Sequence, residues 1–87
     1  MIVKGQRVNW ISQSGGSETE KKGIVLEIIR AGESAMEHVP SGAKKSHIKF
    51  QDKSCIWRAL VAVPAGKGGM IVHYYCPAIS TLEKQDN

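Results

Sequence analysis

Leucine, cysteine and long apolar runs are all scarce in this chain of 87 residues. Leucine occurs three times, against nine isoleucines and seven valines, and β-branched side chains favour strands over helices. No segment reaches the roughly 18 apolar residues that a membrane-spanning helix requires, and residues 1–7 lack the apolar core of a secretory signal. The sequence therefore predicts a cytoplasmic, β-rich protein with no membrane partner.

The two cysteines, Cys55 and Cys76, lack the close partners of a metal or redox motif. Without an export signal we expect two reduced thiols, with a single disulfide as the alternative. Of the three histidines (His38, His47 and His73), the last is nearest to a cysteine, but an offset of three places it on the opposite strand face from Cys76. No nucleophile stands near a base in a known pattern. We therefore expect no metal site, no catalytic residues and no cofactor.

Acidic residues are outnumbered by basic ones, eight to twelve, and the net charge is +4. The excess is concentrated between residues 38 and 53, where Asp52 is the only acidic side chain. The lysines of this segment are Lys44, Lys45, Lys49 and Lys53. Such a patch attracts nucleic-acid phosphates or acidic surfaces, or it serves only solubility.

The segments with the apolar pattern of β-strands are residues 8–11, 23–29, 46–51, 56–63 and 70–76. We expect Gly23 to introduce a bulge or a bend, residues 12–20 to form a mobile loop, and residues 64–69 to form a hairpin tip. Residues 31–43 predict one or two helical turns or a loop, and residues 80–83 predict a single closing turn. Five strands in so short a chain bury their edges best in a partly open barrel.

Both ends of the chain carry short motifs: residues 4–10 (KGQRVNW), 21–25 (KKGIV) and 75–84 (YCPAISTLEK). They resemble SH3-like small barrels of the Tudor type, and the first third is similar to the hypervirulence-associated Tudor domains of bacteria. This resemblance implies an all-β fold, a single five-stranded SH3-like partly open barrel with a short helical insertion or loop and a C-terminal single turn. The domain is expected to span residues 1–83, followed by a polar tail at 84–87.

Residues 72–77 (VHYYCP) and 82–84 (LEK) resemble two segments, V-Q-I-Y-P and A-L-E-R, of the plasmid-borne, trimethoprim-insensitive dihydrofolate reductases. This resemblance implies a tetramer with one central pore that binds folate and nicotinamide. Tyr75 matches the tyrosine of that family, but His73 replaces its glutamine and Tyr74 its isoleucine, and one extra residue precedes Pro77. Because these departures fall on the ligand-binding positions, the reductase is a remote alternative.

Four of the five aromatic residues could line one groove, as a cage for a cationic side chain or as a stacking platform for bases. They are Trp10, Trp57, Tyr74 and Tyr75. Alternatively, both tryptophans fill the core, and strand alternation predicts a buried Trp57 on the apolar face of residues 59–63. Tyr74 and Tyr75 must point to opposite faces, so one of them is expected to be exposed.

These features predict a non-enzymatic interaction module that binds a protein partner or self-associates, with nucleic acid as the alternative partner. The predicted partner-binding residues are Lys44, Lys45, Lys49, Lys53, Tyr74 and Tyr75. The predicted homodimer seam consists of Ile11, Val25, Ile29 and Ile71. Arg58 shares a strand face with Ile56 and Leu60, which predicts an aliphatic stem on an apolar surface and a head in solvent or in a salt bridge.

Overall fold

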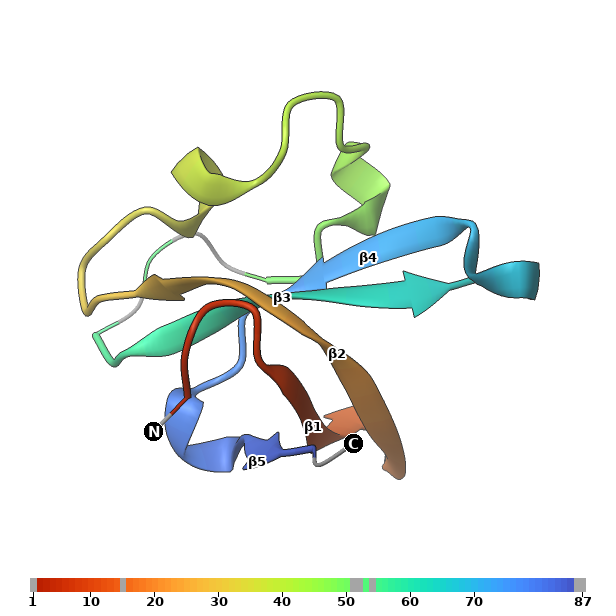
Figure 1. Cartoon of the computed structure of the whole chain (residues 1–87), viewed down its shortest axis with the longest axis horizontal. Helices are drawn as coiled ribbons and strands as arrows, with labels where there is room; N and C mark the ends of the chain where they lie inside the picture. The colour runs from red at the N-terminus through yellow and green to blue at the C-terminus, as the bar shows by residue number, and fades with distance from the viewer. Residues whose placement is uncertain (1, 15, 51–52, 54, 86–87) are drawn as a thin grey trace.

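The described residues, 2–14, 16–50, 53 and 55–85 of this computed structural model, contain five antiparallel strands in one sheet (Figure 1). The strands are β1 (Arg7–Ser14), β2 (Ser17–Ile29), β3 (Arg58–Ala65), β4 (Ile71–Tyr75) and β5 (Glu83–Lys84). Their order across the sheet is β4-β3-β2-β1-β5. The sheet curls without closing, so the predicted all-β fold with a partly open barrel is confirmed.

Short 3-10 turns connect the strands. They are η1 (Ala35–His38), η2 (Lys45–His47), η3 (Lys67–Gly69) and η4 (Ile79–Thr81). η1 provides the predicted helical turn within residues 31–43. η4 begins one residue before the predicted closing turn and overlaps it. None of the helical turns in the described part of the chain is long and apolar enough to cross a membrane.

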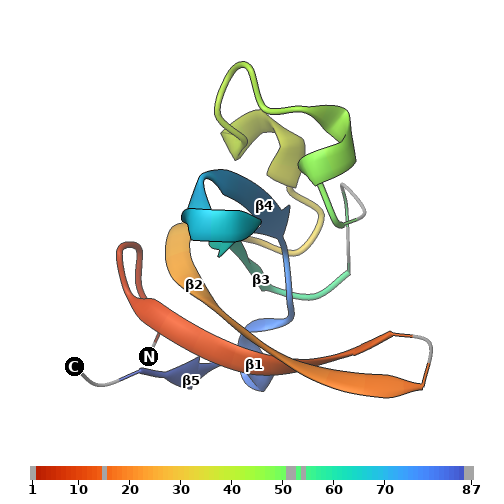
Figure 2. The same cartoon turned by 90° about the vertical axis from the view of Figure 1, so that its right-hand side faces the viewer.

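The predicted mobile loop at residues 12–20 is wrong, because β1 and β2 continue into a long hairpin (Figure 2). The ladder extends through Ser12↔Thr19 to Ser14↔Ser17, which leaves a two-residue turn. Gly16 in this turn has a φ of 82°, the left-handed conformation that two-residue hairpin turns require. Polar side chains do not prevent this pairing, because the ladder consists of backbone hydrogen bonds.

An irregularity between Val25 and Glu27 lets β2 contribute to two hydrophobic clusters. The first cluster comprises Val8, Trp10, Val25, Ala59, Val61 and Val63, and the second comprises Ile29, Ala35, Leu60 and Cys76. The extra residue reverses the side-chain alternation, so Val25 joins the first cluster and Ile29 the second. The strict alternation predicted for residues 24–29 therefore ends at the bulge, which lies beyond Gly23.

The predicted strand at residues 46–51 is wrong over its described part. Residues 45–47 form η2, and Ile48 makes only an isolated parallel bridge to Tyr74. The backbone N–H of Lys49 donates to the Tyr74 carbonyl at 2.8 Å. This segment therefore covers part of the β4 edge, which is the usual protection of an exposed strand. Gln51 lies outside the described residues.

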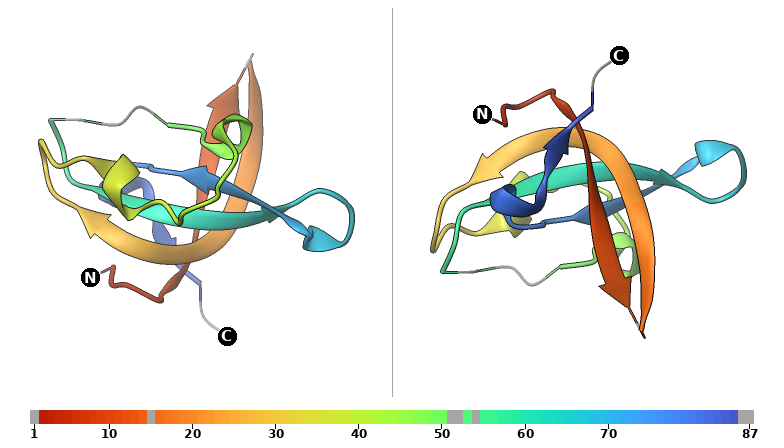
Figure 3. Two further views of the ribbon diagram at one scale, coloured as in Figure 1. Left: turned by 90° about the horizontal axis from the view of Figure 1, so that it is seen from above. Right: turned by 90° about the horizontal axis from the view of Figure 1, so that it is seen from below.

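The fifth strand is instead β5, at residues assigned by prediction to the closing turn and the tail. Its residues pair antiparallel with β1 through Asn9↔Glu83 and Val8↔Lys84. Gln85 continues the contact by donating its backbone N–H to the Arg7 carbonyl at 3.0 Å. β3 and β4 form the predicted hairpin, which projects from the rest of the sheet (Figure 3).

Candidate functional site

The barrel curls until two strands that are not neighbours in the sheet meet through their aromatic rings. Trp10 of β1 and Tyr75 of β4 have ring centroids 5.8 Å apart and an interplanar angle of 68°. This edge-to-face geometry is a favoured aromatic arrangement. Trp10 is 6% exposed, whereas Tyr75 is half-buried. The Tyr75 ring is therefore the more accessible of the two.

Basic side chains gather around the accessible Tyr75 ring. Lys21, opposite Trp10 in the β1–β2 register, places its Nζ 5.2 Å from the Tyr75 centroid. The imidazole of His73 lies 6.5 Å from the same ring and 5.2 Å from the imidazole of His47. We call this set the basic aromatic face, and its members are Trp10, Lys21, His47, Lys49, His73 and Tyr75.

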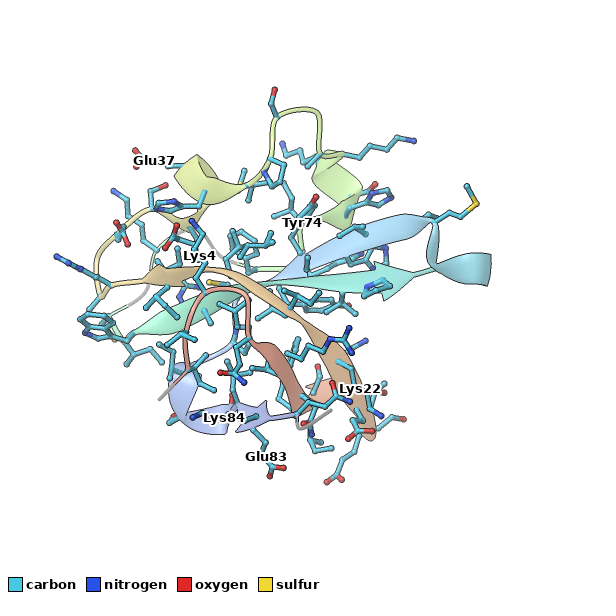
Figure 4. The ribbon with its side chains drawn as sticks, in the orientation of Figure 1. Lys4, Lys22, Glu37, Tyr74, Glu83 and Lys84 are labelled. Atoms are coloured by element: carbon cyan, nitrogen blue, oxygen red, sulfur yellow. The ribbon has the colours of Figure 1, made fainter. Side chains whose placement is uncertain are left out.

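Strand alternation separates the charges of the β1–β2 hairpin. Lys21 points to the basic aromatic face, and its neighbours Glu20 and Lys22 point to the other side. There the Glu20 carboxylate lies 3.7 Å from the Lys22 Nζ and accepts a hydrogen bond from the Asn9 side chain at 3.4 Å. Figure 4 labels Lys22 on this hairpin. The hairpin thus keeps its carboxylates away from Tyr75.

The pKa of His73 reflects this cationic environment. It is lowered from the ordinary histidine value, first by desolvation and then by electrostatic repulsion from Lys49, His47 and Lys21. Two of these three neighbours are lysines, which carry a positive charge at neutral pH. The face therefore has a positive potential that an anionic ligand would relieve.

The structure brings together two of the six predicted partner-binding residues, Lys49 and Tyr75. Tyr74 points from β4 toward the segment with η1 and η2 (Figure 4) and packs against the second hydrophobic cluster. The other three lysines, Lys44, Lys45 and Lys53, are exposed and are not members of the basic aromatic face.

Sequence reasoning missed Lys21, His47 and His73 as site residues. A signal for Lys21 existed, because a two-residue turn at Gly15-Gly16 fixes the register that pairs position 10 with position 21. Recognising that hairpin from the sequence would have placed a lysine directly beside Trp10. The histidines had no comparable signal, because their approach depends on how η2 folds over β4.

Two further predictions for side chains are corrected by the structure. Trp57 is 53% exposed, not buried, because β3 begins only at Arg58 and its alternation does not extend backward. Arg58 is 6% exposed and its Nε atom is buried, so its head does not lie in solvent. Trp57 instead borders an apolar groove of about 500 Å³, lined by Ile2, Val3, Lys4, Ile28, Trp57 and Ile79.

The predicted dimer seam is wrong for two of its four residues. Val25 and Ile29 are 1% and 0% exposed and belong to the two core clusters, so no partner can reach them. Val25 faces the first cluster opposite Val61, and the bulge that follows it turns Ile29 to the second cluster. Both faces of β2 are therefore covered, which the alternation pattern does not reveal. Ile11 and Ile71 are exposed on the surface.

The thiols of Cys55 and Cys76 are not joined; the first is exposed and the second is buried. Among the residues that the structure describes, no group of three histidine, cysteine, aspartate or glutamate side chains could hold a metal ion. Comparison with known proteins found no matching family model, no matching curated protein and no matching solved structure. The described residues form a small, partly open β-barrel whose opening carries basic side chains and aromatic rings.

Proposed function

We propose that this chain is a small, non-enzymatic interaction module that binds single-stranded nucleic acid through the basic aromatic face. The cations around the Tyr75 ring support this function most directly. Proteins that bind single strands combine cations for the phosphates with aromatic rings for the bases. A cage for a cationic ligand is disfavoured, because the Lys21 ammonium beside the Tyr75 ring would repel a second cation.

The open barrel of five strands is compatible with the proposed kinship to SH3-like barrels of the Tudor type. Such a small barrel presents strand faces and turns rather than a deep catalytic cavity, which suits binding better than chemistry. We place this module in the cytoplasm. An acidic protein surface is the alternative partner, since it would meet the same cations.

Fluorescence anisotropy with labelled single- and double-stranded oligonucleotides, repeated across salt concentrations, tests this function. We expect tighter binding to the single strand, because only unpaired bases can stack on an aromatic ring. The logarithm of the affinity should fall linearly with the logarithm of the salt concentration, as counterion release requires. Absence of binding at low salt would refute the proposed function.

His73 is expected to make this binding depend on pH. Because its pKa is lowered, it is neutral at neutral pH and gains a proton only in more acidic solution. Bound phosphate favours the protonated form, so affinity should rise as the pH falls from about 7.5 to about 5.5. We expect His73→Gln to reduce this rise in anisotropy titrations at each pH. An identical pH profile in the variant would exclude a role for His73.

Self-association is a second candidate function, supported by the apolar groove beside Trp57. The exposed indole and the hollow beside it belong to one patch, which is what a two-fold symmetric interface between identical copies requires. Trp57→Ser should then convert a dimer into a monomer in light scattering at high protein concentration. Met70→Ser, at an exposed apolar residue outside the groove and outside the predicted seam, is the matched control. A monomeric mass for the unmodified chain would rule out this function.

A further inference from the structure

A second cavity, of about 260 Å³, opens beside the basic aromatic face. Its lining includes Trp10, Lys49, Phe50, Arg58, Tyr75 and Pro77. Trp10, Lys49 and Tyr75 belong to both sites, so a ligand bound on the face lies at the mouth of this cavity. Its volume is below the roughly 300–1,000 Å³ of pockets for drug-sized molecules, which suits a single planar ring system.

The walls of this cavity are those of a stacking site. The rings of Phe50, Tyr75 and Pro77 supply apolar surfaces, whereas Trp10, which is 6% exposed, borders the cavity with little accessible surface. Phe50 is half-buried against the second hydrophobic cluster, which holds its ring in place. Bases of a single strand bind such surfaces by stacking, whatever their identity.

The charged side chains of this cavity are hydrogen-bond donors. Arg58 is 6% exposed and carries five N–H donors, so it can donate to a ligand while it keeps an interaction within the protein. Lys49 adds an ammonium group, and among the residues that the structure describes no carboxylate or side-chain amide belongs to the lining. Such a lining favours a base edge with a carbonyl oxygen, which guanine, cytosine, thymine and uracil present and adenine lacks.

We propose that this cavity is a base pocket that receives one carbonyl-bearing base (guanine, cytosine, thymine or uracil) of a strand whose phosphates lie on the basic aromatic face. The inference rests on the proposed function, since the phosphates bring the strand to the mouth of the pocket. It adds base selectivity, in that a strand of adenines should bind less tightly than a strand of thymines.

The test compares three DNA strands of equal length and charge: oligothymidine, oligoadenosine and an abasic strand. Because the chain has two tryptophans, the variant Trp57→Phe leaves Trp10 as the only indole reporter. We expect oligothymidine to quench Trp10 fluorescence and to bind about fivefold or more tightly than the other two strands. Phe50→Leu, which removes one ring wall, should reduce the preference for oligothymidine over oligoadenosine.

The outcomes separate the two proposals. Equal affinity for all three strands, without Trp10 quenching, would overturn the base pocket and leave the phosphate-binding face intact. No binding of any strand would overturn both. If Phe50→Leu leaves the preference for oligothymidine unchanged, the preference arises from the stiffness of the stacked adenine strand and not from the pocket. That result would also overturn the pocket. If Phe50→Leu fails to fold, quenching by oligothymidine but not by the abasic strand decides the question.

Discussion

Replacing both Lys21 and Lys49 by glutamate is expected to abolish most of the affinity for a single strand. Both lysines belong to the cationic group around His73, and Lys21 also lies over the Tyr75 ring. Loss of two phosphate contacts should reduce the steepness of log affinity against log salt by about 1.4, at roughly 0.7 per contact with a single strand. Because the new carboxylates also repel phosphate, we expect affinity to fall by roughly tenfold or more at low salt. Anisotropy titrations measure both quantities.

The matched control changes the same number of charges at residues outside the basic aromatic face. Lys22 neighbours Lys21 in β2 but pairs with Asn9 and contacts Glu20, and Lys84 is exposed on β5. The variant Lys22→Glu with Lys84→Glu should therefore bind almost as well as the unmodified chain. An equal loss in both double variants would mean that net charge, and not the basic aromatic face, determines affinity.

A third double variant distinguishes the basic aromatic face from the lysine segment that the sequence predicted as the binding site. Lys44→Glu with Lys45→Glu removes the same charge from the beginning of η2. If this variant loses binding and the Lys21 and Lys49 variant does not, phosphate contacts belong to the predicted lysine segment. The fold should survive in all three, since an exposed cation–π contact contributes only about 0.5–1 kcal/mol.

The fold class follows from composition, because isoleucine and valine dominate the apolar residues and leucine is rare. The strand boundaries are less predictable than the fold class. Apolar alternation identifies β3 and β4, but it misses the polar half of the β1–β2 hairpin and the two residues of β5, whose pairing depends on backbone hydrogen bonds. It also predicts a strand at residues 46–51, but the described part of this segment forms η2 and one isolated bridge.

The site was less predictable than the fold because it depends on curvature. Tyr75 and Lys49 were recognised from residue type, but their meeting with Trp10 and Lys21 requires β1 and β4 to approach across the opening of the sheet. No local pattern encodes that approach. The alternation that assigned Trp57 to the core failed for a different reason, because the strand that would bury it begins one residue later.

Gly23 permits the close approach of β2 to β3, and its replacement by alanine is expected to be strongly destabilising. The residue is buried and its φ is not left-handed. If no atom stood close to the added Cβ, alanine would stabilise the chain by about 0.4–1 kcal/mol, because it makes the unfolded chain less flexible. Here its Cβ would lie 2.7 Å from Cγ1 of Val61, 3.0 Å from Cγ2 of Val63 and closer still to the Ala62 carbonyl oxygen. The backbone oxygen cannot rotate away, so β3 itself must shift.

Overpacking of this kind costs typically about 1–3 kcal/mol. For a chain of this size each kcal/mol lowers the Tm by roughly 4–8 °C, so Gly23→Ala should melt several degrees or more below the unmodified chain in thermal circular dichroism. Gly42→Ala is the control, since it has a φ of 91° and open space around it and incurs only backbone strain of about 1–2 kcal/mol. Because Val61 pairs with Tyr75, a shifted β3 should also weaken oligonucleotide binding in the folded variant. An unchanged or higher Tm for Gly23→Ala would mean that β2 and β3 are not this close, and the curl that brings Trp10 to Tyr75 would need another cause.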